Sequence, residues 1–376
     1  MASTPRLTGL SGNEIYCMRL KGLTPSGVVV GNSIQSMGFL GGVRSAFRGI
    51  VGGEIPDVTQ MIHEGRAAAF KRMRAEADRE GVHGVVGVTS ELRSLGGNSE
   101  FLFVGSGVSG GAGSAPFTSA GDAQELYCHM DAGYDPKEFV FGNIAYSVGA
   151  IGGLTGTLKT LVRGEIREFS DVFNETRHHA LDRLRRHARE SGANAVVGVR
   201  TAVLHFAGFH EMYMTGTAAF HPSLGTPSAG PFSSDLTGEE LWGMTQLGYA
   251  PIKLLISTSV YSLGAVGGLK AAFAGLVRGE LSDLTKLIYE AREQVFDRIQ
   301  REAAQLGAEE VVGIKTYIVE LGPSLVEIFA VGTALRQQNG MGVATQVLPP
   351  QAIIRDKDTW LNGIHGFDPA ALRAGG

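Results

Sequence analysis

Hydrophobic and polar positions follow the same order of patterns three times along the chain. Each repeat opens with an apolar, partly β-branched stretch, which predicts a strand buried on at least one face. A short and then a longer segment follow, both with apolar residues at helical spacing. Two more apolar stretches, the first beginning with VVGV or VVGI, predict a hairpin. The opening stretches are SGVVVGNSIQ, EFVFGNIAY and KLLISTSVY, so the pattern predicts a β-α-α-β-β unit.

The longer helix of each repeat has recognisable start and stop signals. It begins beside an acidic residue, which interacts favourably with the positive end of the helix dipole. It ends at a glycine, which adopts the left-handed conformation of a helix C-terminus at little cost. The acidic residues are Asp57, Glu168 and Asp283, and the glycines are Gly81, Gly192 and Gly307. One long helix covering a small antiparallel sheet gives an α+β unit of roughly 90 residues.

The repeats also share residues at constant offsets. Gly149 follows Gly38 by 111 residues, and Gly264 follows Gly149 by 115. A short leader precedes each copy (NEIYCMRLKGLTP, QELYCHMDAGYDP, EELWGMTQLGYAP) and predicts one or two helical turns, a glycine stop and a proline. A fourth leader motif lies close to the end of the given sequence. We expect this motif, Trp360 to Pro369, to dock where a leader normally packs.

Connectors rich in glycine, serine and proline separate the copies. The predicted organisation is leader plus first unit 1–108, linker 109–122, leader plus second unit 123–220, linker 221–235, leader plus third unit 236–337, and a tail with the fourth leader motif 338–376. A small sheet with one helix leaves sheet edges and an open face. Such units are therefore expected to associate with other copies, within the chain or between chains.

Composition narrows the class of protein. The 376 residues are 43% hydrophobic and 19% charged, which allows sizeable cores. A net charge of -4 argues against nucleic-acid binding, because that function needs a basic face. Two cysteines do not form a disulfide framework and favour a reducing compartment. The first residues lack the apolar core of a signal peptide, so a cytoplasmic location is expected.

One uncharged stretch of 20 residues, 139–158, is long enough to span a bilayer. The equivalent segments of the first and third copies contain Arg44 and Lys270, and the stretch itself holds five glycines. A strand, a turn and a helix therefore explain it better than a membrane span. The short amphipathic helix has basic residues opposite its apolar side, which leaves a peripheral membrane-surface protein as one alternative.

Several motifs recur in all three copies and resemble one known family. GGEI with EGRAAAFKRM, RGEI with ETRHHALDRL, and ARESGANAVVGV with a distal GTA are similar to the YbjQ family, whose members also carry a heavy-metal-binding label. The resemblance implies a dodecin-like subunit that forms five-membered rings with a strand-lined centre. The chain departs from the usual form in having three units, and Gly-Glu where many relatives have Gly-Gly-Arg.

The glycine-rich phrases SMGFLGG, SVGAIGG and SLGAVGG precede the short helices. A phosphate loop would need a lysine after the last glycine pair, and no lysine is held there in register. We therefore predict that these phrases are packing or oligomer loops in which backbones approach closely. The residues are Ser36, Gly38, Gly41, Gly42, Ser147, Gly149, Gly152, Gly153, Ser262, Gly264, Gly267 and Gly268.

Metal-ligand residues do not recur in register. Cys17 and Cys128 are equivalent, but the third copy has Gly243 at that position. His205 and His210 occur only in the hairpin of the second copy. A site used by every unit would place the same ligands in each. No metal cofactor is predicted, and these two cysteines and two histidines are the remaining candidates.

Charged residues on the long helices do recur. Since Glu and Arg two positions apart do not face each other on a helix, we predict ion pairs with a neighbouring unit. The residues are Glu64, Arg66, Arg72, Glu175, Arg177, Arg183, Glu290, Arg292 and Arg298.

No His or Lys recurs with the repeated serines, so no catalytic triad is indicated. The sequence predicts a non-enzymatic protein whose partner is itself, a self-assembling homo-oligomer with a five-fold ring or a larger assembly. The alternatives are a metal- or small-ligand-binding protein with its site at the ring centre, and the peripheral membrane protein.

Overall fold

Each repeat contains a leader helix, a long first strand, a long helix and a hairpin, in the predicted order. The first unit comprises α1 (Gly12–Leu20), β1 (Leu23–Ser36), α3 (Pro56–Arg79), β3 (Gly84–Leu95) and β4 (Asn98–Gly110). The second comprises α4 (Ala123–Asp131), β6 (Asp135–Ser147), α6 (Arg167–Glu190), β8 (Ala195–Phe206) and β9 (Phe209–Phe220). The third comprises α7 (Gly238–Gln246), β11 (Tyr249–Ser262), α9 (Ser282–Gln305), β12 (Glu310–Gly322) and β13 (Leu325–Gln337). The α+β class is confirmed.

The computed structural model describes residues 7–36, 53–96, 98–110, 115–147, 164–206, 209–262, 282–322 and 325–349. The three units belong to one body, Met1–Ala344, and Thr345–Gly376 form a second. Three predicted features lie outside the described residues. They are the glycines of the three phrases, the short amphipathic helices and the fourth leader motif.

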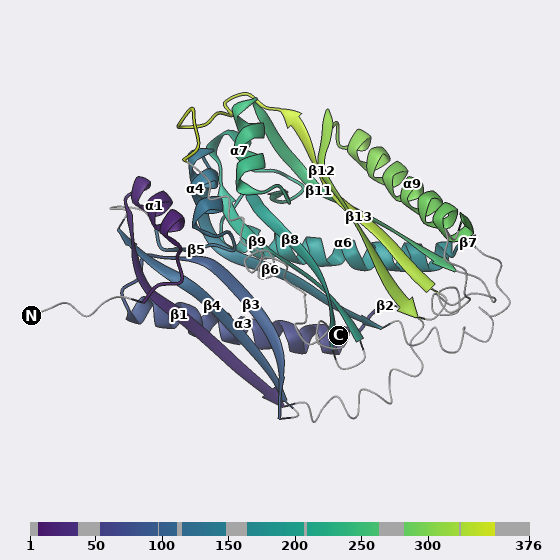
Figure 1. Ribbon diagram of the computed structural model, residues 1–376, viewed down its shortest axis with the longest axis horizontal. Coiled ribbons are helices and arrows are strands. Elements are labelled where there is room, and N and C mark those ends of the chain that lie inside the picture. Colours follow the sequence, from purple (N-terminus) through teal and green to yellow (C-terminus); the bar gives the residue numbers. More distant parts are fainter. Residues whose placement is uncertain are drawn as a thin grey trace, which may run out of the picture. The chain divides into compact units, whose positions relative to one another are not determined.

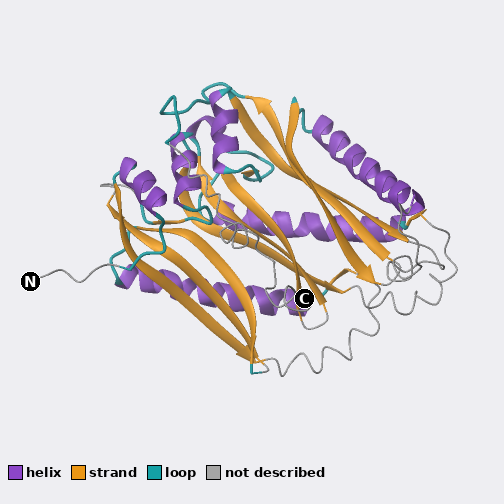
Figure 2. Ribbon diagram, in the orientation of Figure 1, coloured by secondary structure: helices purple, strands orange, loops and turns teal. Residues whose placement is uncertain are grey.

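Helix ends follow the local signals. Each leader helix starts with a capping box, in which an N-cap side chain (Ser11, Asp122 or Thr237) accepts a backbone hydrogen bond and a glutamate three residues later reaches back. The helices α3, α6 and α9 are followed by the predicted glycines in the left-handed region, with φ of 64°, 76° and 67°. These stops leave only a short turn before each hairpin (Figure 2).

The sheets are larger than the three strands expected for each unit. Their strand orders are β1-β4-β3-β5, β10-β8-β9-β6-β2 and β12-β13-β11-β7. Two additional strands, β5 (Phe117–Thr118) and β10 (Phe232–Ser233), come from the predicted linkers and pair in parallel with β3 and β8. Two others, β2 (Gly53–Glu54) and β7 (Gly164–Glu165), pair with β6 and β11 of the following unit. The Gly-Glu pairs of the first two units therefore each add an edge strand to the next sheet.

The first strands begin earlier than the apolar pattern indicates, because the leader prolines lie inside them. Pro25, Pro136 and Pro251 each stand at a register shift in β1, β6 and β11. Proline lacks a backbone N–H, and a bulge tolerates that loss. The glycine of VVGV marks a second bulge, since Gly87, Gly198 and Gly313 have φ near 60° beside register shifts. These bulges were not predicted.

Each of the first two long helices lies between its own sheet and the sheet of the following unit (Figure 1). On α3, Phe70 contacts Phe103 of its own sheet and Phe139 of the second unit, with ring centroids 5.4 and 5.5 Å apart. On α6, Leu181 and Leu184 share one buried cluster with residues of β11 and β13. The hydrophobic cores therefore cross the unit boundaries.

The uncharged stretch 139–158 contributes its first residues, 139–147, to β6. Among the described helices, none combines the length with the hydrophobicity that a bilayer crossing requires.

Close approach between strand and helix gives one sharp prediction. A Cβ atom at Gly142 would stand 2.2 Å from the carbonyl oxygen of Ala180 and 2.6 Å from the amide nitrogen of Leu184. Both are backbone atoms, which no rotamer change can move. Gly142→Ala should therefore lower the free energy of unfolding by about 1–3 kcal/mol, as overpacking does. A urea titration would measure this, with Gly243→Ala as the control, because its Cβ meets nothing within 4 Å.

Candidate functional site: the interfaces between units

A fully buried ion pair joins the first and second units. Arg66 on α3 donates from Nη1 and Nη2 to the two carboxylate oxygens of Glu211 on β9, at 2.6 and 3.1 Å. Both side chains are 0% exposed. The guanidinium also lies 3.8 Å from the ring centroid of Tyr213, a cation–π distance. The pair is bidentate and desolvated, so it fixes the geometry of the interface.

The second and third units repeat this arrangement. Arg177 on α6 donates from Nε and Nη2 to Glu327 on β13, at 3.1 and 2.5 Å, and again both side chains are 0% exposed. Arg177 also donates to the hydroxyl of Tyr146, and Thr258 donates to Glu327. Burial works against the charged guanidinium, but Glu327 and Tyr146 more than offset it and raise the pKa of Arg177.

Half-buried pairs flank each of these contacts. Arg183 binds Glu54 of the preceding unit at 2.7 Å, and Arg298 binds Glu165 at 2.6 Å. The glutamates belong to β2 and β7, so the short edge strand and the ion pair form one contact. The recurrence of Gly-Glu at the same offsets as the arginines was the sequence signal for this contact.

The glutamates predicted to pair with a neighbouring unit, which lie on the long helices, instead make contacts within their own helices. Glu64 accepts a hydrogen bond from Gln60, Glu175 lies 3.7 Å from His179, and Glu290 lies 3.8 Å from Lys286, all within single exposed helix faces. The repeated serines Ser36, Ser147 and Ser262 are the last residues of β1, β6 and β11.

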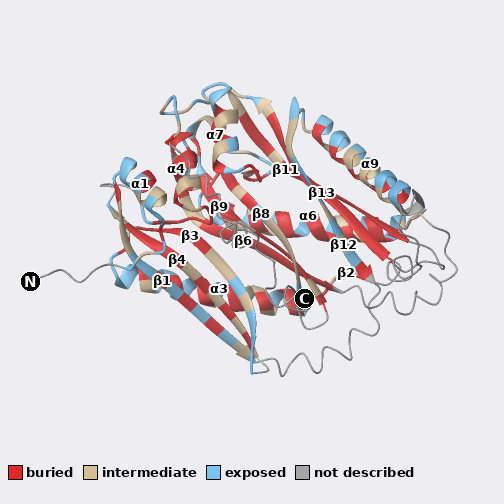
Figure 3. Cartoon of the chain, in the orientation of Figure 1, coloured by how far each residue is buried: buried red, intermediate tan, exposed pale blue. Residues whose placement is uncertain are grey.

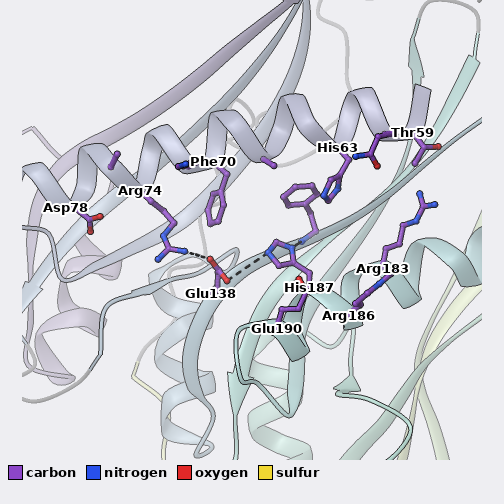
Figure 4. Close-up of a pocket in the computed structure, with 15 residues that line it drawn as sticks. Thr59, His63, Phe70, Arg74, Asp78, Glu138, Arg183, Arg186, His187 and Glu190 are labelled. Carbon is purple, nitrogen blue, oxygen red and sulfur yellow. Dashed lines mark hydrogen bonds and ion pairs between the residues drawn. The ribbon is translucent and has the colours of Figure 1, made fainter. Parts of the chain in front are cut away.

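A groove of about 750 Å³ runs between α3 and α6 (Figure 4). At its floor Glu138 forms an ion pair with Arg74 and lies 4.0 Å from Nε2 of His187. The ring of Phe141 separates His187 from His63, with centroids 5.4 and 5.2 Å away. Burial lowers the pKa of His63. The carboxylate is already paired, and Phe141 holds the two imidazoles apart.

The candidate metal ligands are divided between two places. Cys17 and Cys128 are buried in the leader helices α1 and α4, where burial raises the pKa of both thiols, that of Cys128 to about 12. His205 and His210 face each other across the second hairpin, with centroids 4.3 Å apart. Burial, then His205 and Arg177, lower the pKa of His210 to about 4. Within the described ranges, no three His, Cys, Asp or Glu side chains are grouped as a metal site.

These thiols should be unreactive in the folded protein. Thiolate is the reactive form, and at pH 7 both the raised pKa and 0% exposure oppose it at Cys128. We expect an aromatic disulfide reagent to modify neither cysteine in native buffer and both in 6 M guanidinium. Fast labelling of the native protein would contradict this assignment.

The repeated units and their buried interfaces define a tandem-domain protein of the α+β class. The chain belongs to the YbjQ family, described as "Putative heavy-metal-binding", whose model matches residues 20–110, 134–221 and 249–338.

Its relatives match stretches of different length in this chain. It is 32% identical over 238 residues to "Encapsulin nanocompartment protein Rv1762c" of Mycobacterium tuberculosis, covering 58% of this chain and 88% of the relative. A UPF0145 protein of Methanocella arvoryzae is 48% identical over 61 residues, 16% of this chain and 51% of the relative. One from Methanococcus maripaludis is 45% identical over 83 residues, 22% and 74% of the respective chains. No solved structure matches this chain significantly.

Proposed function

We propose that this protein is a non-enzymatic, cytoplasmic, self-assembling protein that forms a homo-oligomer, a five-fold ring or a larger assembly, through its repeated units. The observation that carries the proposal is the pair of inter-unit contacts centred on Arg66–Glu211 and Arg177–Glu327. Desolvated ion pairs inside continuous apolar cores are typical of permanent rather than transient contacts. The relative named as an encapsulin nanocompartment protein supports an assembling role.

A second candidate function is binding of a metal or small ligand, and the His205–His210 pair favours it. Nδ1 of His210 is buried and has no hydrogen-bond partner among the described residues. Two imidazoles with ring centroids 4.3 Å apart could share a transition-metal ion such as zinc. The positive charge of Arg177, which helps lower the pKa of His210, opposes such binding.

The deciding experiment is the native mass of the untagged protein by light scattering, with metal analysis on the same peak. A mass of several chains of 39.7 kDa each, without stoichiometric metal, is the expected result. A metal-free monomer would refute self-assembly. A metal-loaded monomer would refute it in favour of the second candidate, and His205→Ala should then remove the metal.

A further inference from the structure

The third unit has a counterpart of the buried arginines, and the first unit has a counterpart of the buried glutamates. Neither counterpart is in an ion pair among the described residues. Arg292 on α9 is the counterpart of Arg66 and Arg177, 115 residues after the latter. Glu100 on β4 is the counterpart of Glu211, 111 residues before it. The paired counterparts are 0% exposed, whereas Arg292 and Glu100 are half-buried. Neither forms an ion pair with any residue that the structure describes, and Glu100 only accepts a hydrogen bond from Asn32.

Apolar surface surrounds each unused charge. On the outer face of β1, Val28, Val30 and Ile34 are 42%, 42% and 52% exposed. Their counterparts in β6 and β11 are at most 2% exposed, because α3 or α6 of the preceding unit covers them (Figure 3). Those counterparts are Phe139, Phe141 and Ala145 in the second unit, and Leu254, Ile256 and Val260 in the third.

Residues on the outer side of α9 are likewise more exposed than their counterparts in α3 and α6. Tyr289 is 62% exposed, and Phe296 is half-buried where its counterparts Phe70 and Leu181 are buried. Thr59 and Ser170 each accept a hydrogen bond from the backbone of the following sheet, at 2.9 Å. Their counterpart Thr285 is exposed. The third helix therefore has the features that bind a following sheet, and the first sheet has the features that bind a preceding helix.

We propose that copies of this chain join head to tail, with α9 of one copy covered by the outer face of the first sheet of another. Arg292 then forms with Glu100 of the second copy the ion pair that Arg66 and Arg177 form within the chain. The occupant is a second copy because this contact continues an interface present twice in the same molecule and pairs opposite charges. β1 and α9 lie at opposite ends of the three units, so one chain does not close on itself (Figure 1). This inference rests on the proposed self-assembly.

Two consequences follow from the geometry. A head-to-tail contact is heterologous, so it produces a ring or a filament rather than a two-fold dimer. Whole chains contribute three consecutive units each, so such a ring holds a multiple of three units, which fits the larger assembly rather than a five-unit ring. Leu102 stands where Tyr213 and Phe329 lie under the internal arginines. The contact between chains therefore lacks the aromatic ring that the following sheet supplies in the internal contacts, and should be weaker than those within the chain.

A charge exchange between chains tests the proposal. In Arg292→Glu, two glutamates meet at every junction, and in Glu100→Arg, two arginines meet. Each variant alone should have the mass of one chain at concentrations where the wild type assembles. In a 1:1 mixture the two variants alternate, which pairs Arg with Glu at each junction. The mass should therefore rise from one chain to several, and reach the wild-type value where the assembly holds an even number of chains. Arg79→Glu, a reversal at a 72% exposed site on α3, is the control and should leave the mass unchanged.

Light scattering on the wild type and these four samples separates the outcomes. Loss in both single variants with recovery in the mixture supports the proposal, and recovery also shows that both variants are folded. Assembly of the single variants as well as the wild type would overturn this interface while leaving self-assembly intact. Loss without recovery in the mixture would overturn it too. A monomeric wild type would refute the proposed function itself.

Discussion

Replacing Arg177 by methionine is expected to lower the free energy of unfolding by about 3–5 kcal/mol. The reason is that Glu327 would remain 0% exposed with its charge uncompensated. Thr258 would still donate to the carboxylate, but Tyr146 would lose its guanidinium partner. Removing one member of a desolvated pair costs far more than the pair contributes, because the other charge stays in a low dielectric.

Urea unfolding, followed by circular dichroism and by light scattering, measures this effect. The double variant Arg177→Met with Glu327→Met should recover most of the loss, because no charge is then buried. Arg183→Met is the matched control on the same helix, since Arg183 is 31% exposed in its pair with Glu54. It should cost no more than about 1 kcal/mol. Equal losses for Arg177→Met and Arg183→Met would show that burial of the pair is not what stabilises the interface.

Acid should destabilise the protein through His129. Burial, and then Arg200, lower the pKa of this histidine to about 3, against an ordinary value of 6.5. The folded state therefore holds the neutral ring, and the unfolded chain binds a proton at higher pH. The stabilising contribution is complete above pH 6.5 and is lost as the pH falls through 6.5 toward 3. At pH 5 the loss should be roughly 2 kcal/mol for this residue.

His129→Met is the appropriate variant, because methionine occupies the same position in the other two leaders as Met18 and Met244. Both ring nitrogens of His129 are buried without a hydrogen-bond partner among the described residues, so the substitution breaks no such bond. Urea midpoints measured between pH 7 and pH 5 should fall less steeply in this variant than in the wild type. His179→Gln, at a 49% exposed site, should leave the slope unchanged. An unchanged slope in His129→Met would contradict a buried neutral imidazole.

Periodicity and repetition were sufficient to predict the long helices, the first strands and the hairpins, though not the bulges in the strands. The apolar stripes, the acidic starts and the glycine stops predicted the long helices, and the repeated offsets predicted three equivalent units. These signals extend over one to a few helical turns. Residues close together in the sequence are therefore enough to reveal them. The linker strands β5 and β10 escaped prediction because two residues carry no period, and their pairing with β3 and β8 depends on distant residues.

The partners of the recurring arginines could not be inferred from spacing on one helix. Arg66 finds Glu211 across 145 residues, and Arg177 finds Glu327 across 150. The glutamates that recur at one position of the long helices, Glu64, Glu175 and Glu290, form contacts within their own helices. Whether a recurring charge faces solvent or another unit depends on which side of the helix the next sheet covers, and that is a property of packing.

The sequence by itself determined the three α+β units, their order and their family, because hydrophobic period and turn chemistry are local. Only the tertiary structure decided how the units join. Packing of a helix on the next sheet brings residues from different units of the chain together in one desolvated core. It also decided that the cysteines are buried packing residues and that the Gly-Glu pairs of the first two units extend the next sheet. The same packing leaves Glu100 and Arg292 without an ion-pair partner among the described residues.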